Sequence, residues 1–242
     1  MLINIAHRGL SAIAPENTLY SFDRALQSGM NHLEFDIQLS SDKIPVVIHD
    51  DRLDRTTNLV GKVNERTIAE LRKAQALNNF NSLHNVDKKL LGIPTLDDLL
   101  IRYTDKAHLY IELKSPDHAL PEIVAESLIK NNALKYSSSP PQSAPGLTII
   151  GFSLEQVLRS KYLLPKVKHG WLRYDLHEID INLVSNLELD GIYPFVKNIK
   201  KDLVHFAKKK NIVVGVWGVE TKKEYNNLLS MEVHGATVNW VP

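Results

Sequence analysis

The sequence predicts an α/β fold, and specifically a (β/α)₈ TIM barrel with a small insertion after the third strand. Three observations predict it. Short apolar runs bounded by turn signals alternate with segments of helical periodicity, which is typical of βαβ units and a parallel sheet. The chain has 242 residues, and single α/β barrels run to about 250 residues. The alternation covers the whole chain without an internal repeat or a long linker.

Short apolar runs are interpreted here as buried strands. The candidate strands are residues 2–6, 32–39, 45–48, 109–113, 147–152, 167–172, 191–194, 212–217 and 236–239. These are more candidates than the eight places of the barrel, and the connection from Leu39 to Pro45 is too short for a helix. Either that connection returns without a helix, or one candidate is not a barrel strand.

Segments with a 3.6-residue apolar period are interpreted as helices. The predicted helices are residues 17–28, 68–76, 95–103, 121–131, 154–163, 181–187, 200–209 and 222–230. Gly29 is a stop signal for the first helix, and Thr95 is a candidate N-cap. Residues 51–93 are polar and irregular, and 137–146 form a Ser/Pro-rich loop. We therefore predict one domain over residues 1–242, with an insertion subdomain at about 51–93.

The composition excludes several classes of protein. There are 29 Lys and Arg against 28 Asp and Glu, so no net field favours nucleic acid or an anionic membrane. The chain has no Cys, which excludes disulfide scaffolds and Cys-ligated metal sites. No apolar run approaches the roughly 18–20 residues of a membrane span. The six residues before His7 are too few for a signal peptide, so a cytoplasmic location is expected. No exposed aromatic cluster or amphipathic anchor is evident, so we expect no stable membrane insertion. The oligomeric state is not predicted.

Three carboxylates stand in apolar strands near the predicted mouth of the barrel. Glu34 and Asp36 are two residues apart, so both side chains point to one face. Glu112 lies at the same level of a neighbouring strand. A buried carboxylate is costly unless it is paired or binds a metal, and three together repel one another. Oxygen ligands of this kind suit Mg²⁺ or Ca²⁺. A structural salt bridge, with Lys114 or Arg8 neutralising part of the cluster, is the alternative.

Two histidines and two cations follow the same strands. His7 and Arg8 end the first strand, His49 ends the third, and Lys114 follows Glu112 by two residues. Histidines exchange protons near neutral pH and serve as general acid and base. Arg8 and Lys114 would contact an anionic group, although Arg8 could instead pair with Glu16 or Asp36. Metal, cations and imidazoles together suit attack on a phosphoryl centre.

In these stretches the sequence resembles the glycerophosphodiester phosphodiesterase family. The matching stretches are His7-Arg8-Gly9, Pro15-Glu16-Asn17-Thr18, residues 33–36 (LEFD), residues 45–50 (PVVIHD), residues 54–57 (DRTT), residues 93–96 (IPTL) and residues 110–114 (YIELK). Gly151-Phe152-Ser153 and Val216-Trp217 are weaker echoes. Each motif alone is weak, but the ordered set covers most of the chain and is highly specific.

The resemblance implies a barrel of the phosphatidylinositol-phospholipase-C-like type and a role for each matching residue. It implies that His7 and His49 are the acid–base pair and that Glu34, Asp36 and Glu112 hold one divalent cation, Mg²⁺ or Ca²⁺. The implied substrate-binding residues are Arg8 and Lys114 at the phosphate, Glu16 and Asn17 in the first loop, and Phe152 and Trp217 along the pocket. The implied activity is metal-dependent hydrolysis of a glycerophosphodiester to sn-glycerol 3-phosphate and an alcohol.

Two positions depart from the family pattern. Glu220 stands where Asn is usual, and Asn239 stands where Asp is usual. These departures bear on substrate preference. They also leave open a binding protein that holds a glycerophosphodiester without turnover. A further alternative is a lyase that releases a cyclic phosphate from a lysophospholipid, which would need an apolar rim facing the membrane.

Overall fold

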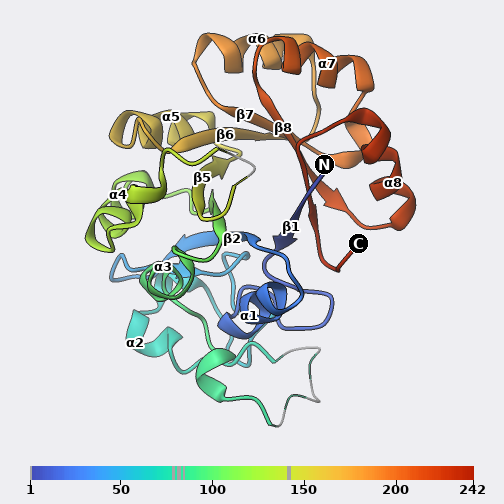
Figure 1. Cartoon of the computed structure of the whole chain (residues 1–242). Coiled ribbons are helices and arrows are strands. Elements are labelled where there is room, and N and C mark those ends of the chain that lie inside the picture. The colour runs from blue at the N-terminus through green and yellow to red at the C-terminus, as the bar shows by residue number, and fades with distance from the viewer. Residues whose placement is uncertain (1, 78–79, 81–82, 84, 141–142) are drawn as a thin grey trace.

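Parallel strands close into a barrel at the centre of the computed structural model (Figure 1). The structure describes residues 2–77, 80, 83, 85–140 and 143–242, so parts of the predicted insertion and of the 137–146 loop lie outside the described residues. The barrel strands of the described chain are β1 (Ile3–His7), β2 (His32–Leu39), β4 (His108–Leu113), β5 (Gly146–Gly151), β6 (Lys168–Arg173), β7 (Gly191–Pro194), β8 (Val213–Val219) and β9 (Gly235–Val238). β1 pairs in parallel with both β2 and β9, which closes the barrel and confirms the predicted fold class.

The surplus candidate strand is β3 (Pro45–Val47), which lies outside the barrel. It pairs antiparallel with β2, with Val47 opposite Ile37, while β2 pairs directly with β4. Lys43 has a φ of 61° in the connecting turn, where no helix forms. Both alternatives raised by the sequence therefore hold, because the connection returns without a helix and the returning strand is not a barrel strand.

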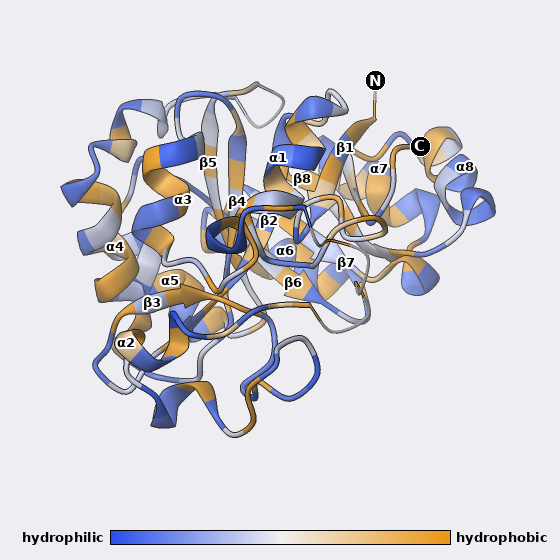
Figure 2. Cartoon of the chain, turned by 90° about the horizontal axis from the view of Figure 1, so that it is seen from below, coloured by the Kyte–Doolittle hydropathy of each residue, from blue (hydrophilic) through white to orange (hydrophobic). Residues whose placement is uncertain are grey.

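The described helices have bounds close to those predicted, except for α2, which lies in the segment after β3. They are α1 (Leu19–Gln27), α2 (Ile68–Leu71), α3 (Leu96–Tyr103), α4 (Leu120–Lys130), α5 (Leu154–Leu163), α6 (Glu178–Asn186), α7 (Lys201–Lys209) and α8 (Lys222–Met231). Short 3₁₀ turns are η1 (Val63–Glu65), η2 (Lys88–Leu90), η3 (Ala133–Tyr136) and η4 (Val196–Asn198). Thr95 caps α3 as predicted, since its hydroxyl accepts from the Asp98 amide. Figure 2 shows hydrophobic and hydrophilic positions alternating along α3 and α4, as expected of helices with one buried face. None of the described helices has the length and apolarity that a bilayer crossing requires.

Inside the barrel, a compact set of side chains forms the floor below the mouth. Ile5, Tyr110, Ile150, Leu172 and Tyr193 make one buried cluster. Gly170 and Gly215 make room for it, because the Tyr193 ring lies where their side chains would be. This cluster fills the barrel interior beneath the carboxyl ends of the strands, where barrel enzymes carry their sites.

The segment that follows β3 has buried residues of its own. Val46, Ile48, Leu53, Val63, Leu71, Ala74 and Ile93 pack as a cluster separate from the main core. The helix predicted over 68–76 ends at Leu71, because the chain then turns and the Ala76 amide donates to the Leu91 carbonyl. We propose that residues of about 51–93 form an insertion subdomain on a single barrel domain.

Candidate active site

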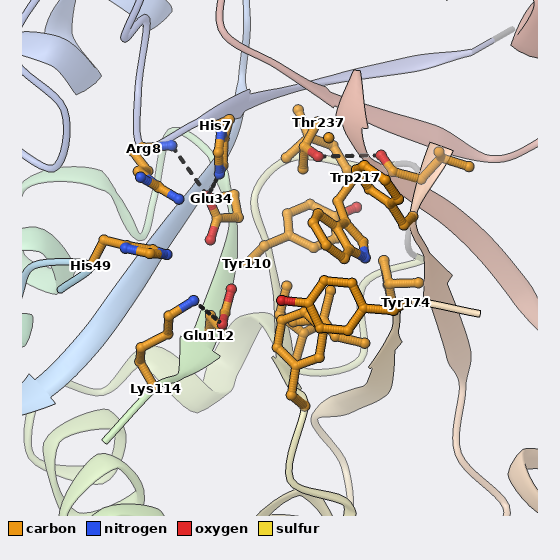
Figure 3. Close-up of a pocket in the computed structure, with 18 of the residues that line it drawn as sticks. His7, Arg8, Glu34, His49, Tyr110, Glu112, Lys114, Tyr174, Trp217 and Thr237 are labelled. Carbon is orange, nitrogen blue, oxygen red and sulfur yellow. Dashed lines mark hydrogen bonds and ion pairs between the residues drawn. The ribbon is translucent and has the colours of Figure 1, made fainter. Parts of the chain in front are cut away.

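Three buried carboxylates meet at the barrel mouth, and Figure 3 shows two of them, Glu34 and Glu112. Asp36 on β2 is in register with Glu112 on β4, and Glu34 lies two residues before Asp36. Their exposed fractions are 1%, 7% and 2%, in the order Asp36, Glu112, Glu34. One oxygen of each lies within 4.8 Å of the others. Glu34 Oε1 and Asp36 Oδ1 have no hydrogen-bond partner. Clustered oxygens without donors fit a hard divalent cation, so the residues present suit the predicted metal.

Burial and mutual repulsion disturb the titration of this cluster. Burial raises the pKa of Glu34 well above its usual value, and Asp36 and Glu112 add to the effect. Burial raises the pKa of Glu112 to about 7, against the attraction of Lys114. Asp36 shows the opposite result, since Arg8, His49, Lys114 and Asn17 outweigh burial and lower its pKa. Without a cation, Glu34 and Glu112 therefore bind protons up to a higher pH than free carboxylates do.

Two cations flank the carboxylates. Arg8 Nε lies 3.2 Å from Asp36 Oδ2, and its Nη1 donates to Glu16 at 2.9 Å. Lys114 Nζ donates to Glu112 at 2.8 Å and lies 3.6 Å from Asp36. Both ion pairs that the sequence offered as alternatives for Arg8 are therefore present. Asn17, with a φ of 58°, donates from Nδ2 to Asp36 Oδ2 at 2.9 Å.

His7 and His49 are each held through Nδ1. His7 Nδ1 lies 2.8 Å from Asn239 Oδ1, which also accepts from Ser11 Oγ. His49 Nδ1 lies 2.6 Å from Asp50 Oδ1. Because each partner atom is an acceptor, the proton of each neutral ring sits on Nδ1 and Nε2 is left as the base. Burial lowers the pKa of His7 to about 4, and it also lowers that of His49.

Arg55 joins the two sides of the site, a role that the sequence did not predict. Its guanidinium donates to both oxygens of Asp50, at 2.6 and 3.1 Å. It also donates to both oxygens of Glu16, at 2.8 and 2.7 Å. Through these carboxylates Arg55 is connected to His49 and to Arg8. Its motif, DRTT, was visible in the sequence, but its contact with Glu16, 39 positions away, was not.

Aromatic side chains line the opposite wall of the cavity. Trp217 lies with its ring centre 5.5 Å from Phe152, 5.1 Å from Tyr174 and 4.7 Å from Phe195. We call these four residues the aromatic wall. Tyr174 is 61% exposed and the other three are partly buried, so the expectation that the chain has no exposed aromatic cluster stays a prediction. Tyr174 and Phe195 follow β6 and β7 directly, and their position at strand ends was a usable signal.

The structure brings most of the predicted site residues into one cavity of about 260 Å³. Those that line it are His7, Arg8, Glu34, His49, Glu112, Lys114, Phe152 and Trp217. Asp36 contacts the lining through Arg8 and Lys114. Glu16 and Asn17 are not among the residues that line this cavity. Glu16 accepts a hydrogen bond from Arg8, and Asn17 donates one to Asp36. The roles of these residues stay predictions, although the geometry places them together.

The fold and this arrangement of groups define a barrel phosphodiesterase. Residues 7–241 match the glycerophosphoryl diester phosphodiesterase family, and the chain belongs to that family. It is 34% identical to a glycerophosphodiester phosphodiesterase of Caldanaerobacter subterraneus over 96% of this chain and 91% of that protein. A Bacillus subtilis glycerophosphodiester phosphodiesterase is 29% identical over 99% of this chain and 84% of its own length. The resemblance predicted from the sequence is confirmed.

Solved structures agree with this assignment. A phosphodiesterase from Oleispira antarctica, in complex with the product sn-glycerol-3-phosphate, superposes with a TM-score of 0.82. It is 26% identical, and the match covers 98% of this chain and 92% of that one. A Silicibacter pomeroyi protein superposes with a TM-score of 0.83 at 21% identity, covering 99% of this chain and 90% of that chain, and supports the fold alone.

Proposed function

We propose that His7 and His49 exchange protons with a glycerophosphodiester whose phosphate is held by Arg8, Lys114 and a divalent cation on Glu34, Asp36 and Glu112. As a member of its family, the chain is a phosphodiesterase that hydrolyses glycerophosphodiesters to sn-glycerol 3-phosphate and an alcohol. The convergence of imidazoles, cations and carboxylates on one cavity carries the proposal.

The chain's own residues would act in three ways. Arg8 and Lys114 place positive charge where the phosphate gains negative charge. The Nε2 atom of one imidazole accepts the proton of the attacking hydroxyl, while the other ring, entering as the imidazolium, donates its Nε2 proton to the departing alkoxide, so that the two rings exchange protonation states. Asn239 and Asp50 hold the two rings so that Nε2 faces the reaction. A divalent cation, when bound, supplies further positive charge for the phosphate oxygens.

The attacking hydroxyl has two possible sources, water or the adjacent hydroxyl of the glycerol. The second would give a cyclic phosphate that water then opens. Phosphorus NMR during turnover distinguishes them, since no cyclic species at any time point counts against the second route.

Replacing each histidine tests the acid–base assignment. General acid–base groups contribute about 10²–10⁴-fold each. We expect His7→Ala and His49→Ala to lower kcat by at least 100-fold, with glycerol 3-phosphate release as the assay. His205→Ala, at an exposed position on α7, is the matched control and should keep full turnover. Near-full turnover in either site variant would refute its role.

The cation requires a separate test. The double variant Glu34→Gln, Asp36→Asn should lose both activity and metal binding, measured by calorimetry with Mg²⁺ and with Ca²⁺. The same titrations on the unaltered chain decide between the two ions by affinity. Normal turnover in chelator-treated protein would mean that the three carboxylates are structural.

One observation favours keeping the lyase as a second candidate. The aromatic wall, with Tyr174 61% exposed, supplies an apolar feature at the cavity mouth that a lysophospholipid substrate would need. Turnover of glycerophosphocholine and lysophosphatidylcholine should be compared. Faster turnover of the lysophospholipid, with a cyclic phosphate as product, would favour the lyase.

A further inference from the structure

Glu220 lines the cavity, and among the described residues its carboxylate has no hydrogen-bond or ion-pair partner. Six other ionisable residues in the cavity lining each form a hydrogen bond or an ion pair: His7, Arg8, Glu34, His49, Glu112 and Lys114. Within the described part of the chain, no such contact is made by the Glu220 carboxylate, and only its backbone amide donates, to Glu224. The residue is exposed, so its carboxylate is available to a ligand in the cavity.

A bulge in β8 brings Glu220 to the same cavity as Trp217. Successive side chains of a regular strand point to opposite faces. The pairing of β8 with β9 shifts between Val216 and Val219, and Val216, Trp217 and Glu220 all line the cavity. Gly218 permits this path, since its φ is 77° and the Phe195 ring lies where a side chain would be. The bulge therefore places an indole-bearing residue and a carboxylate-bearing residue at the edge of one cavity.

The aromatic wall lines the cavity beside Glu220. Trp217 Nε1 donates to the Arg173 carbonyl at 3.2 Å, which fixes the indole and satisfies its polar atom. Lys197 Nζ lies 5.7 Å from the centre of Phe195, so that ring already has a cation beside it. Trp217 and the exposed Tyr174 remain for a ligand. Aromatic faces attract cations within about 6 Å, and Trp does so most strongly.

The two sides of the cavity thus have opposite preferences. Arg8 and Lys114 suit an anion, while Glu220 and the aromatic wall suit a cation with an apolar surface. We propose that Glu220, Trp217 and Tyr174 form a subsite for the leaving alcohol of the substrate, and that this alcohol is a cationic amino alcohol such as choline. The proposal rests on the proposed function, because it assumes that the phosphate lies at Arg8 and Lys114.

A pair of substrates that differ only in charge tests the subsite. One is glycerophosphocholine, and the other is its neutral 3,3-dimethylbutyl ester, in which carbon replaces the quaternary nitrogen. The measured quantity is the ratio of their kcat/KM values, compared between the unaltered chain and Glu220→Gln. Comparing the ratio between proteins cancels the intrinsic difference in leaving-group reactivity. We expect E220Q to lower the ratio about 2- to 5-fold, the effect of one solvent-exposed charge pair, and to leave the neutral ester unaffected.

Glu155→Gln is the matched control. Glu155 has a 67% exposed side chain and lines a neighbouring cavity that shares Lys114 and Tyr174 with the first. We expect E155Q to leave the ratio unchanged. An unchanged ratio in E220Q overturns the proposal. An equal fall of the ratio in E155Q also overturns it, because any negative charge near the cavity mouth would then have the same effect.

The two proposals fail in different ways. Turnover of both substrates with an unchanged ratio in E220Q overturns the subsite and leaves the phosphodiesterase function intact. If neither substrate yields glycerol 3-phosphate, the proposed function is overturned. Binding then decides on the subsite, by calorimetry of both diesters with His49→Ala protein in Mg²⁺. A dissociation constant that rises with E220Q for the choline ester alone supports it, and equal values for both proteins overturn it.

Discussion

Replacing Glu112 by Gln should stabilise the metal-free protein at alkaline pH, although Glu112 is a predicted metal ligand. The pKa of Glu112 in the folded chain is about 7, and an unfolded chain titrates glutamate near 4.3–4.5. The folded state therefore binds more protons between these values, and the free energy of unfolding falls as pH rises through this window. Stability from this group is complete below about pH 4.5 and is lost above about pH 7.

The size of the effect follows from the same difference. About 2.5 pH units correspond to about 3 kcal/mol at pH 8, for a side chain that is only 10% exposed. The pKa already includes the attraction of Lys114. Gln keeps the shape of the neutral carboxyl and carries no charge. We therefore expect E112Q to be about 3 kcal/mol more stable than the unaltered chain at pH 8, and less than about 1 kcal/mol different at pH 5.

Urea unfolding in chelator at pH 5 and pH 8 measures both differences. Mg²⁺ or Ca²⁺ at 1,000 times its dissociation constant should reverse the order at pH 8, because binding then stabilises the unaltered chain by about 4.1 kcal/mol and E112Q lacks one of the ligand oxygens. Glu155→Gln, exposed and outside the cluster, should behave like the unaltered chain. Equal stabilities of E112Q and the unaltered chain at pH 8 in chelator would refute the electrostatic reasoning. A metal-induced gain that persists in E112Q would refute the ligand assignment.

Three further predictions concern residues around the site. Arg55→Gln should lower kcat/KM about tenfold, as for other residues that orient a reactive group, because Arg55 holds Asp50 and Glu16. Arg55→Lys should recover little activity, because lysine lacks the planar guanidinium that contacts both carboxylates. Unchanged kinetics in Arg55→Gln would contradict this positioning role. Gly218→Ala should cost about 1–3 kcal/mol in urea unfolding, because its φ of 77° is strained for alanine and Phe195 occupies the space. His108 is buried with a folded pKa of about 4, so stability from its neutral form is complete above about pH 6.5 and is lost as pH falls toward 4. Between pH 7 and pH 5, the free energy of unfolding of His108→Gln should therefore fall by about 2 kcal/mol less than that of the unaltered chain. An equal fall in both proteins would contradict the lowered pKa of His108.

Much of the fold was predictable because its signals are local. Apolar runs and 3.6-residue periods depend only on neighbouring residues, and β2, α5 and β7 match their predicted bounds. Thr95 was identified as a cap because its partner lies three residues on. β3 was harder, since whether a strand joins a barrel depends on which strand pairs with β2.

In the candidate site, too, the features with local signals were predictable and those that depend on long-range contacts were not. Strand-end position and short motifs identified His7, His49 and the three carboxylates, and the order of motifs along the chain identified the family. Local sequence does not determine contacts between distant segments. The Arg55 bridge joins residues 39 positions apart, and the Asn239 contact with His7 spans 232 positions.

Residue types and spacing therefore predicted the acid–base, cationic and metal-binding groups of this chain, because ionisable groups in apolar strands have few roles. Tertiary structure decided which of those groups touch. It paired Arg8 with Asp36 and Glu16. Through the bulge in β8, it also brought Glu220 and Trp217 to the lining of one cavity. Closure of the barrel is the physical reason, since it brings strand ends from the whole chain to one mouth.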